Sequence, residues 1–587
     1  MMKRLITFFA VAFLLSTPAM LLVSCGDDDP VTEQTSPASD ASNDKNKSDD
    51  DSKKPSDDSS QNENMGWPAN YGGVMLQGFY WDSYDDSNWA VLERQATELS
   101  QYFDLIWVPN SAYANSLSSN MGYHPVYWFD HKSAFGTEAQ LRSMISTFRE
   151  KGTGIIEDVV INHRASVDAN WLNFPAEVYK GVTYQLTAAD ICQDDESKDN
   201  GYKPSGARDS GEGWGGARDL DHSGANVQKN VNAYLDFLLN DLGYTGFRYD
   251  FVKGFSGKYV GEYNKTAQPR FSVGECWDGN KTVVTSWINA TKTDGVIRSA
   301  AFDFPMKYRL NAAFGSQQYN QLTQPMLAND VNYARYAVTF VDNHDTYCED
   351  SRLGSNVCAA NAYILCMPGT PCLFLKHWQQ NKGTLKRLIA LRRAAGITNQ
   401  SKMTLKATAT GAVVTTQGVK GTVVLLLGSA QADTAKLHLA VEGKNFAAYA
   451  DASVDLTTVM SVTDADAQPE ERVTVTIPSF CTVVAGETCA FFESPASWGD
   501  IIMCWRWDNN YNYTGNQWPG ANCTLLGTAD NGRKVWKWTW DGKRTSASSP
   551  DSGIIFNNGS NAHQTSNLDF YNGGYYTEDG YFDTVKQ

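Results

Sequence analysis

The sequence predicts an α/β protein built on a parallel (β/α)8 barrel, with one domain inserted after the third strand and two β domains after the barrel. Eight short apolar runs alternate with longer segments of helical periodicity between residues 65 and 400, and such alternation is typical of a closed parallel barrel. The connection from residue 162 to about residue 226 is too long for a loop, which indicates a small inserted domain. After residue 400, apolar runs are separated by turns, which indicates antiparallel β structure.

The N-terminus is predicted to be an export signal followed by a tether. Residues 1–24 join a basic start to an apolar stretch, as signal peptides do, and Leu22-Val-Ser-Cys25 resembles a bacterial lipobox. The acidic Gly26–Asp29 resembles the surface-export signal of Bacteroidetes lipoproteins. These resemblances imply an outer-membrane, cell-surface lipoprotein anchored through Cys25, and a secretory signal with a chance cysteine is the alternative. Residues 25–64 lack apolar content and are expected to be disordered.

The eight apolar runs define the expected barrel strands. They occupy Gly73–Tyr80, Leu105–Pro109, Gly154–Val160, Gly246–Phe251, Ser272–Cys276, Ser299–Phe304, Ala337–Asp342 and Thr370–Leu375. The segments between them, such as Glu138–Lys151 and Val227–Leu242, space their apolar residues as helices do. Residues 65–400 therefore form the predicted barrel, with its inserted domain at about 162–226.

Two smaller domains are expected after the barrel. Residues 401–497 contain runs such as Gly421–Leu427 and Arg472–Ile477, which indicate an antiparallel β domain. Residues 498–587 are expected to form a β-sandwich of their own. Trp536, Trp538 and Trp540 alternate along one expected strand and are predicted to supply its core.

Composition limits the partners and the covalent chemistry. A net charge of −17 argues against nucleic acid as a partner. Apart from Cys25, ten cysteines lack the spacing of a metal site. Cys481/Cys489 and Cys504/Cys523 are candidate disulfides, since an exported chain meets oxidising conditions, and the sequence leaves this open.

Polar side chains follow four of the predicted barrel strands. In a parallel barrel, the carboxyl ends of all strands meet on one face, where functional residues collect. Arg248 and Asp250 lie two residues apart and so point the same way along their strand. Such a pair alone would fit a structural salt bridge. The other strand ends carry Glu157–His163, Gly274–Trp277 and Phe340–Asp345, so the sequence predicts one cluster of carboxylates and histidines.

These strand ends carry a family resemblance. Asp158–His163, Gly246–Asp250, Gly274–Glu275 and Phe340–Asp345 resemble the four ordered motifs of glycoside hydrolase family 13, the α-amylases. The likeness is closest to the plant-type enzymes and covers roughly residues 70–430. It extends to Gly78–Trp81, Gly122–Pro125, Ile191–Asp195 and Tyr363–Leu375.

The resemblance implies a retaining glycosidase that uses two carboxyl groups. Asp250 would be the nucleophile and Glu275 the general acid and base, with Asp345 stabilising the transition state. Arg248 would keep Asp250 ionised.

The resemblance also implies the groups that hold the sugar. His163 and His344 would hydrogen-bond the sugar ring next to the cleaved bond, and Tyr123 would stack under it. Trp277 would line the leaving-group side. Lys253 matches a family position near the second sugar on that side, and a solvated charge is its alternative reading.

Family members hold a structural Ca²⁺ between the barrel and the inserted domain, and calcium binds six to eight oxygens. The resemblance assigns Asn162, Asp219 and the Gly254 carbonyl as ligands. The sequence departs from the plant-type pattern at Gly213, where that pattern has an aspartate. Glu212 and Asp209 are the possible substitutes.

The last ninety or so residues resemble the starch-binding modules of bacterial amylases, through Trp505–Trp518, Ile554–Gly559, Gln564 and Asp569. This implies that Trp505, Trp507 and Trp518 stack on glucose rings.

The expected function is endo-hydrolysis of α-1,4 bonds in starch, related α-glucans and maltooligosaccharides. Three alternatives stay open: an exo-acting or maltogenic enzyme, a glucan transferase, and a non-catalytic starch-binding surface protein. The presence of all three acids, Asp250, Glu275 and Asp345, argues against the last.

Overall fold

The structure is a computed structural model, and it describes residues 66–115, 120–348, 351–462, 477–495 and most of 498–585. The expected signal, Cys25 and the tether lie outside the described residues, as do Asp569 and most of the run Arg472–Ile477. No helix of the described part is both long and apolar enough to span a membrane.

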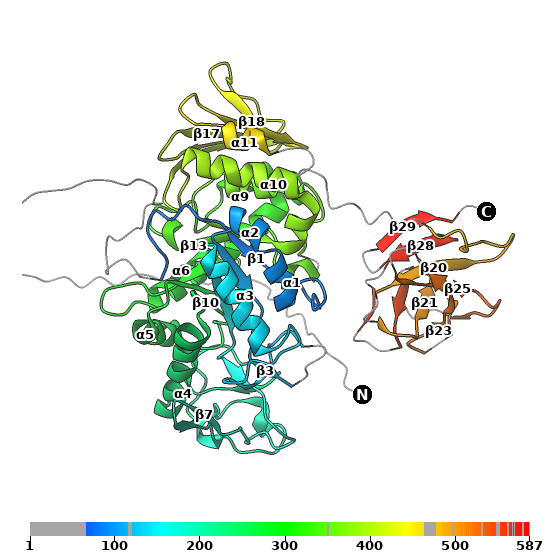
Figure 1. The fold of residues 1–587 in the computed structure, drawn as a ribbon, viewed down its shortest axis with the longest axis horizontal. Helices are drawn as coiled ribbons and strands as arrows, with labels where there is room; N and C mark the ends of the chain where they lie inside the picture. The colour runs from blue at the N-terminus through cyan, green and yellow to red at the C-terminus, as the bar shows by residue number, and fades with distance from the viewer. Residues whose placement is uncertain are drawn as a thin grey trace, which may run out of the picture. The chain divides into compact units, whose positions relative to one another are not determined.

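A closed eight-stranded parallel barrel forms the body of the chain (Figure 1). Its strands in chain order are β1 (Met75–Gln77), β2 (Leu105–Val108), β5 (Gly154–Val159), β10 (Gly246–Tyr249), β11 (Phe271–Gly274), β12 (Ala300–Phe302), β13 (Ala337–Phe340) and β14 (Thr370–Phe374). All eight fall within the predicted runs or one residue beyond them, and β14 closes the barrel against β1. The predicted fold class is confirmed.

Helices follow the strands as a barrel requires. They are α1 (Trp89–Arg94), α2 (Ala96–Tyr102), α3 (Glu138–Glu150), α4 (Ala225–Asp236), α5 (Gly257–Ala267), α6 (Lys281–Ala290), α7 (Phe304–Leu310), α8 (His344–Cys348), α9 (Val357–Leu365) and α10 (Leu375–Ala395). The helix predicted at Glu138–Lys151 is α3, and Thr137 caps it with a capping box. The one predicted at Val227–Leu242 is α4, continued by a π-helical turn.

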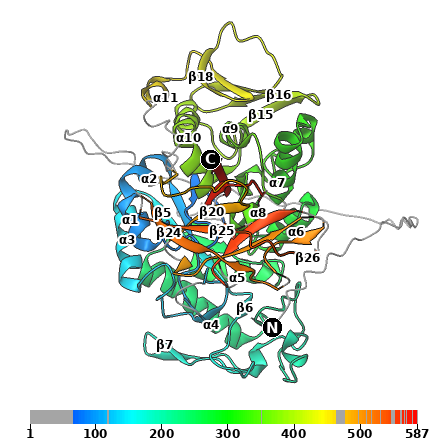
Figure 2. The same ribbon diagram turned by 90° about the vertical axis from the view of Figure 1, so that its right-hand side faces the viewer.

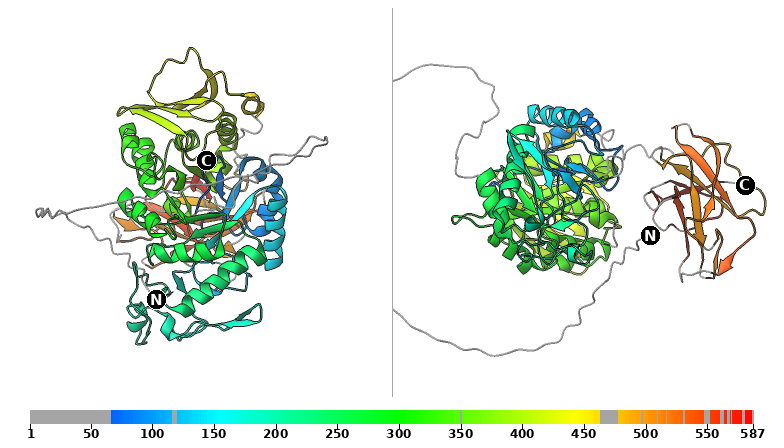
Figure 3. Two further views of the ribbon diagram at one scale, coloured as in Figure 1. Left: turned by 90° about the vertical axis from the view of Figure 1, so that its left-hand side faces the viewer. Right: turned by 90° about the horizontal axis from the view of Figure 1, so that it is seen from below.

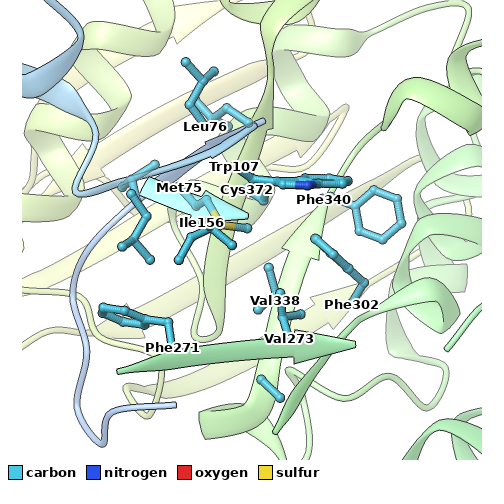
Figure 4. Packing of buried hydrophobic residues seen from close by; sticks show 14 of the residues in the cluster. Met75, Leu76, Trp107, Ile156, Phe271, Val273, Phe302, Val338, Phe340 and Cys372 are labelled. Carbon is cyan, nitrogen blue, oxygen red and sulfur yellow. The ribbon is translucent and has the colours of Figure 1, made fainter. Parts of the chain in front are cut away.

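Buried apolar side chains from the strands fill the barrel (Figure 4). Met75, Phe271 and Val338 are almost wholly removed from solvent. Polar side chains are also buried here, and they come from the carboxyl ends of the strands. Because the register pairs Arg248 on β10 with Asp158 on β5, these two charged residues lie side by side on neighbouring strands.

The long connection after β5 forms small paired strands. Its pairs are β6 (His163–Arg164) with β9 (Arg218–Asp219), and β7 (Glu177–Tyr179) with β8 (Val182–Tyr184). Before β5, β3 (Tyr113–Ala114) pairs with β4 (Pro125–Tyr127). The β6–β9 pair returns the connection to the end of β5.

A five-stranded antiparallel sheet follows the barrel (Figure 2). It contains β15 (Lys402–Ala407), β16 (Gly411–Gln417), β17 (Thr422–Gly428), β18 (His438–Gly443) and β19 (Phe446–Ala450), followed by α11 (Thr457–Ser461). Its buried side chains, such as Val414 and Leu425, belong to the same hydrophobic cluster as the barrel. The sheet thus extends the barrel's core.

The C-terminal unit is a sandwich of two sheets (Figure 3). One sheet has the order β24 (Thr524–Thr528), β25 (Lys534–Thr539), β20 (Cys489–Ser494), β28 (Gly574–Thr577), β29 (Gly580–Thr584). The other joins β21 (Met503–Trp507), β22 (Tyr511–Asn512), β23 (Ala521–Asn522), β26 (Thr545–Ser546) and β27 (Gly553–Asn557). Phe492 stacks on Phe556 between the sheets, with ring centroids 4.6 Å apart.

The boundary expected at residue 497 needs correction. β20 is a central strand of the C-terminal sheet, where it pairs with β25 and β28. Ile477, Cys481 and Val483 pack with Phe491 on the outer face of that sheet. Residues 477–494 therefore belong to the C-terminal unit. No disulfide joins any of the ten described cysteines, including the candidate pairs.

Candidate active site

A single buried guanidinium group binds three carboxylates at the carboxyl ends of the barrel strands. Arg248 Nη1 lies 2.5 Å from Asp158 Oδ1 and 2.7 Å from Asp250 Oδ1, and Nη2 lies 2.7 Å from Glu275 Oε1. Burial opposes the charge of Arg248, but the carboxylates of Asp158, Glu275 and Asp250 outweigh it and raise its pKa above the ordinary value. The group is therefore a fixed positive charge between β5, β10 and β11.

Glu275 is positioned to carry a proton. Its Oε2 accepts a hydrogen bond from the Phe251 amide at 3.1 Å. Its Oε1 is close to Arg248 Nη2 but not in hydrogen-bond geometry, and it has no other hydrogen-bond partner in the described part of the chain. Burial raises the pKa of Glu275 to about 8, with Asp250 and Asp345 adding to the rise and Arg248 opposing it. Near neutral pH this carboxyl group can donate a proton.

Asp345 and His344 begin α8, directly after β13. Trp81 donates its indole N–H to Asp345 Oδ1 at 3.0 Å. His344 Nε2 lies 2.6 Å from the Tyr123 hydroxyl, and His344 Nδ1 lies 3.0 Å from Gln77 Nε2. Burial lowers the pKa of His344. The imidazole is thus neutral and held at both ring nitrogens.

Tyr123 and His163 complete the predicted group. The rings of Tyr123 and His344 stack, with centroids 5.6 Å apart. His163 Nε2 lies 2.9 Å from the Tyr123 carbonyl oxygen. The indole of Trp214 from the inserted domain covers His163, with ring centroids 4.1 Å apart. The structure therefore brings together Tyr123, His163, Arg248, Asp250, Glu275, His344 and Asp345.

Several positioning residues were not singled out from the sequence. Asp158 Oδ2 accepts from the Tyr123 hydroxyl at 3.0 Å and from the Trp107 indole at 3.2 Å, besides its ion pair with Arg248. Gln77 is buried and holds His344. A polar residue inside an apolar strand is a signal for such a role, and both Asp158 and Gln77 show it.

Trp277 and Lys253 lie beside Glu275. The Trp277 ring stacks on Phe304 with centroids 5.0 Å apart, and its N–H donates to the Tyr308 hydroxyl at 2.9 Å. Lys253 Nζ forms ion pairs with Glu212 at 2.8 Å and with Asp278 at 3.5 Å. Lys253 therefore lies near the carboxylate cluster, and its charge is paired with Glu212 and Asp278.

The three expected metal ligands converge between the barrel and the inserted domain. Asn162 Nδ2 donates to Asp219 Oδ1 at 2.8 Å. A Cβ atom on Gly254 would lie 2.1 Å from Asn162 Oδ1, so only glycine fits against this amide. The described residues hold no metal-binding group made of three or more His, Cys, Asp or Glu. Any ion here would depend on amide and carbonyl oxygens as well.

Gly213 stands where the plant-type pattern has a calcium-binding aspartate, and the two possible substitutes have different surroundings. Glu212 is turned to Lys253, and its side chain is 59% exposed. Asp209 Oδ2 is buried without a hydrogen-bond partner among the described residues. Asp209 also lies near enough to Asp219 to help burial raise the pKa of that carboxyl group to about 8. Asp209 therefore fits the position better than Glu212.

The three tryptophans that were expected to stack on glucose differ in their exposure. The rings of Trp505 and Trp518 lie 5.9 Å apart, and Trp518 is 36% exposed. Trp507 is buried, and its ring lies so close to Gly553 that a Cβ there would come within 2.9 Å. The expectation that Trp507 stacks on sugar is therefore wrong, because its ring serves packing. Trp536 and Trp538 lie in the core as predicted.

The geometry at the barrel's carboxyl face suits acid–base and nucleophilic chemistry. Asp250 and Glu275 share one guanidinium group, so they are neighbours. One carboxyl group with a raised pKa beside a second that is ion-paired to arginine is the division of labour found in glycosidases.

Two family descriptions match the chain. "Alpha amylase, catalytic domain" matches residues 102–383. "Glucan 1,4-alpha-maltotetraohydrolase, domain C" matches residues 378–438.

Individual proteins are also similar to this chain. Probable alpha-amylase 2 of Arabidopsis thaliana is 30% identical over 352 residues, which span 56% of this chain and 82% of that protein. Glucan 1,4-alpha-maltotetraohydrolase of Stutzerimonas stutzeri is 28% identical over 388 residues, spanning 61% of this chain and 68% of that protein. The crystal structure of the alpha-amylase from Geobacillus thermoleovorans aligns over 65% of this chain and 98% of its own, with a TM-score of 0.48 and 15% identity.

Proposed function

Because the chain belongs to the α-amylase family, and so is a glycoside hydrolase acting on α-glucans, we propose that it cleaves internal α-1,4-glucosidic bonds of starch-like chains with retention. The observation that carries the proposal is the pair Asp250 and Glu275, bound to one guanidinium group of Arg248. Retaining enzymes need two carboxyl groups close together, whereas inverting enzymes need room for a water molecule between them.

Asp250 is the proposed nucleophile. Its Oδ1 lies 2.7 Å from Arg248 Nη1, and this ion pair positions the carboxylate that attacks the sugar carbon. Attack by the carboxylate breaks the glycosidic bond and forms a glycosyl-enzyme. The leaving oxygen takes its proton from Glu275, and Glu275 then removes a proton from the water that releases the sugar.

Asp345, His163, His344 and Tyr123 are proposed to hold the sugar ring that reacts. Trp81 fixes the Asp345 carboxylate, and Gln77 and Tyr123 fix the His344 ring. Groups locked in this way lose little freedom when the substrate binds, so their hydrogen bonds favour the transition state. Trp277 and Lys253 are proposed to contact sugars on the leaving-group side.

Release of short maltooligosaccharides from chain ends is the second candidate activity. The match of residues 378–438 to a maltotetraohydrolase domain favours it. Product lengths from amylose over time separate the two, since internal cleavage shortens long chains before small sugars accumulate.

We also propose a structural Ca²⁺ ion held by Asn162, Asp219, Asp209 and the Gly254 carbonyl. The unpartnered buried oxygen of Asp209 and the contact of Asn162 with Gly254 and Asp219 support this assignment. Such an ion would neutralise the buried carboxylates and join the inserted domain to the segment that follows Asp250.

The C-terminal unit is proposed to bind α-glucan through Trp505 and Trp518. Their paired rings and the exposure of Trp518 support a stacking surface. At the other end of the chain, the lipobox-like Leu22–Cys25 supports anchoring of a surface lipoprotein in the outer membrane.

Replacing Glu275 tests the assignment of the acid. Glu275→Gln should lower kcat on maltoheptaose by about 10²–10⁴-fold, because the amide cannot donate the proton. The loss should be much smaller for glycosylation by α-maltosyl fluoride, whose leaving group needs no proton. Asp250→Asn is the matched variant and should lose both reactions. Full turnover of maltoheptaose by Glu275→Gln would disprove the role.

The pH profile tests the raised pKa of Glu275. The acid must be protonated, so kcat/KM should be high below the pKa and fall tenfold per pH unit once pH exceeds about 8. The measurement is kcat/KM for maltoheptaose between pH 5 and 10, over a range where the enzyme stays folded. A kcat/KM that already falls tenfold per pH unit from pH 5 upward would show that the pKa of Glu275 is not raised.

Calcium binding is tested by thermal unfolding. A ligand at about 100 times its Kd stabilises the folded state by about 2.7 kcal/mol, so calcium added after EGTA treatment should raise Tm by a few degrees. Asp219→Asn and Asp209→Asn should reduce this rise, and Glu212→Gln should keep it. A rise that Asp209→Asn leaves intact would exclude Asp209 as a ligand.

Retention on starch granules tests the C-terminal unit. Trp518→Ala and Trp505→Ala should weaken binding to insoluble starch while hydrolysis of maltoheptaose stays unchanged. The control is Leu525→Ala, which removes an exposed apolar side chain from the same unit. Equal retention by all three variants would locate starch binding elsewhere.

Fractionation of bacterial cells tests the anchor. Cys25→Ala should move the protein from the membrane fraction to the soluble fraction, because the lipid attachment site is gone. Cys348→Ala serves as the control for loss of an exposed thiol. Membrane association that survives Cys25→Ala would rule out lipidation.

A further inference from the structure

Tyr308 is the most exposed aromatic side chain among the described residues of the barrel, 66–400. It is 37% exposed and lies on α7, which follows β12. Large rings in this barrel are otherwise buried or half-buried. An exposed ring at the face that carries the catalytic groups needs a reason, since its apolar surface is left in water.

The ring is held in place at both ends. Its hydroxyl accepts the Trp277 indole N–H at 2.9 Å, and this leaves the hydroxyl hydrogen available for another acceptor. The ring also lies along the backbone at Gly279, where a Cβ would come within 3.0 Å of Cδ2. Trp277 in turn stacks on the fully buried Phe304. The core therefore fixes Tyr308 through Trp277.

The position of Glu275 shows on which side of the cleaved bond the Tyr308 ring lies. The proposed acid protonates the leaving oxygen, so the leaving sugars must lie on the Glu275 side. Trp277 follows Glu275 by two residues in the sequence, and Tyr308 is hydrogen-bonded to Trp277. Asp278 and Lys253 add polar groups beside the two rings.

We propose that Tyr308 determines specificity by stacking on the second glucose unit of the leaving group, next to the unit that Trp277 contacts. The inference rests on the proposed hydrolytic function and assigns a residue to its leaving-group side. A ring already fixed by Trp277 and Gly279 loses little entropy on binding, so its contact surface contributes fully to affinity. Long substrates gain from this contact, and substrates without leaving-group sugars do not.

Two substrates separate this role from a structural one. Maltoheptaose places sugars on both sides of the cleaved bond, whereas α-maltosyl fluoride leaves only a fluoride ion on the leaving-group side. Tyr308→Ala should lower kcat/KM for maltoheptaose about tenfold, the effect expected for one lost aromatic contact. Its kcat/KM for α-maltosyl fluoride should stay within about twofold of the unmodified enzyme.

Further variants and products sharpen the experiment. Tyr308→Phe keeps the ring and should retain most of the activity on maltoheptaose, while Val331→Ala controls for loss of an exposed apolar side chain. Tyr308→Ala should also release less maltose from the reducing end of maltoheptaose. Equal losses on both substrates would show a structural role, and no loss on either would place Tyr308 outside the site. Failure of the unmodified enzyme on both substrates would instead overturn the proposed function.

Discussion

One buried cation, Arg248, is the constraint on which the active site depends. Three carboxylates from three neighbouring strands lie within 2.7 Å of its guanidinium group. Without it, they would repel one another in a place where water cannot screen them. The cluster still holds more negative than positive charge, and Asp250 and Asp345 add to the rise that burial causes in the pKa of Glu275. Arg248 therefore holds the proposed acid and the proposed nucleophile side by side.

The barrel was predictable because a local sequence pattern marks each of its strands. A short apolar run between polar segments defines a buried strand whatever its neighbours are, and all eight runs became barrel strands. The active-site group was predictable for a related reason, since parallel strands bring their carboxyl ends to one face. Gln77 and Asp158 stand out in the sequence as polar residues inside apolar strands, but which side chains they hold became known only from their contacts.

The errors came from contacts between distant segments. β20 is a short, fully buried run that could belong to either β domain, and only its pairing with β25 and β28 assigns it to the C-terminal unit. The alternation of Trp505 and Trp507 predicts a shared face but not what covers it. Gly553, far along the chain, gives the Trp507 ring room to pack. Neither fact can be derived from periodicity, because both depend on long-range pairing.

The place of β20 has a consequence for the order in which the chain folds during synthesis. β20 is the first described strand of the C-terminal unit to be synthesised, yet its parallel partner β28 comes only after β21–β27. The pairing of β20 with β28 can form only after β28 has been synthesised, because a contact between segments far apart in sequence needs both of them. The barrel can fold while this unit is still being made, and the open edge of β20 stays unpaired on that side in the meantime.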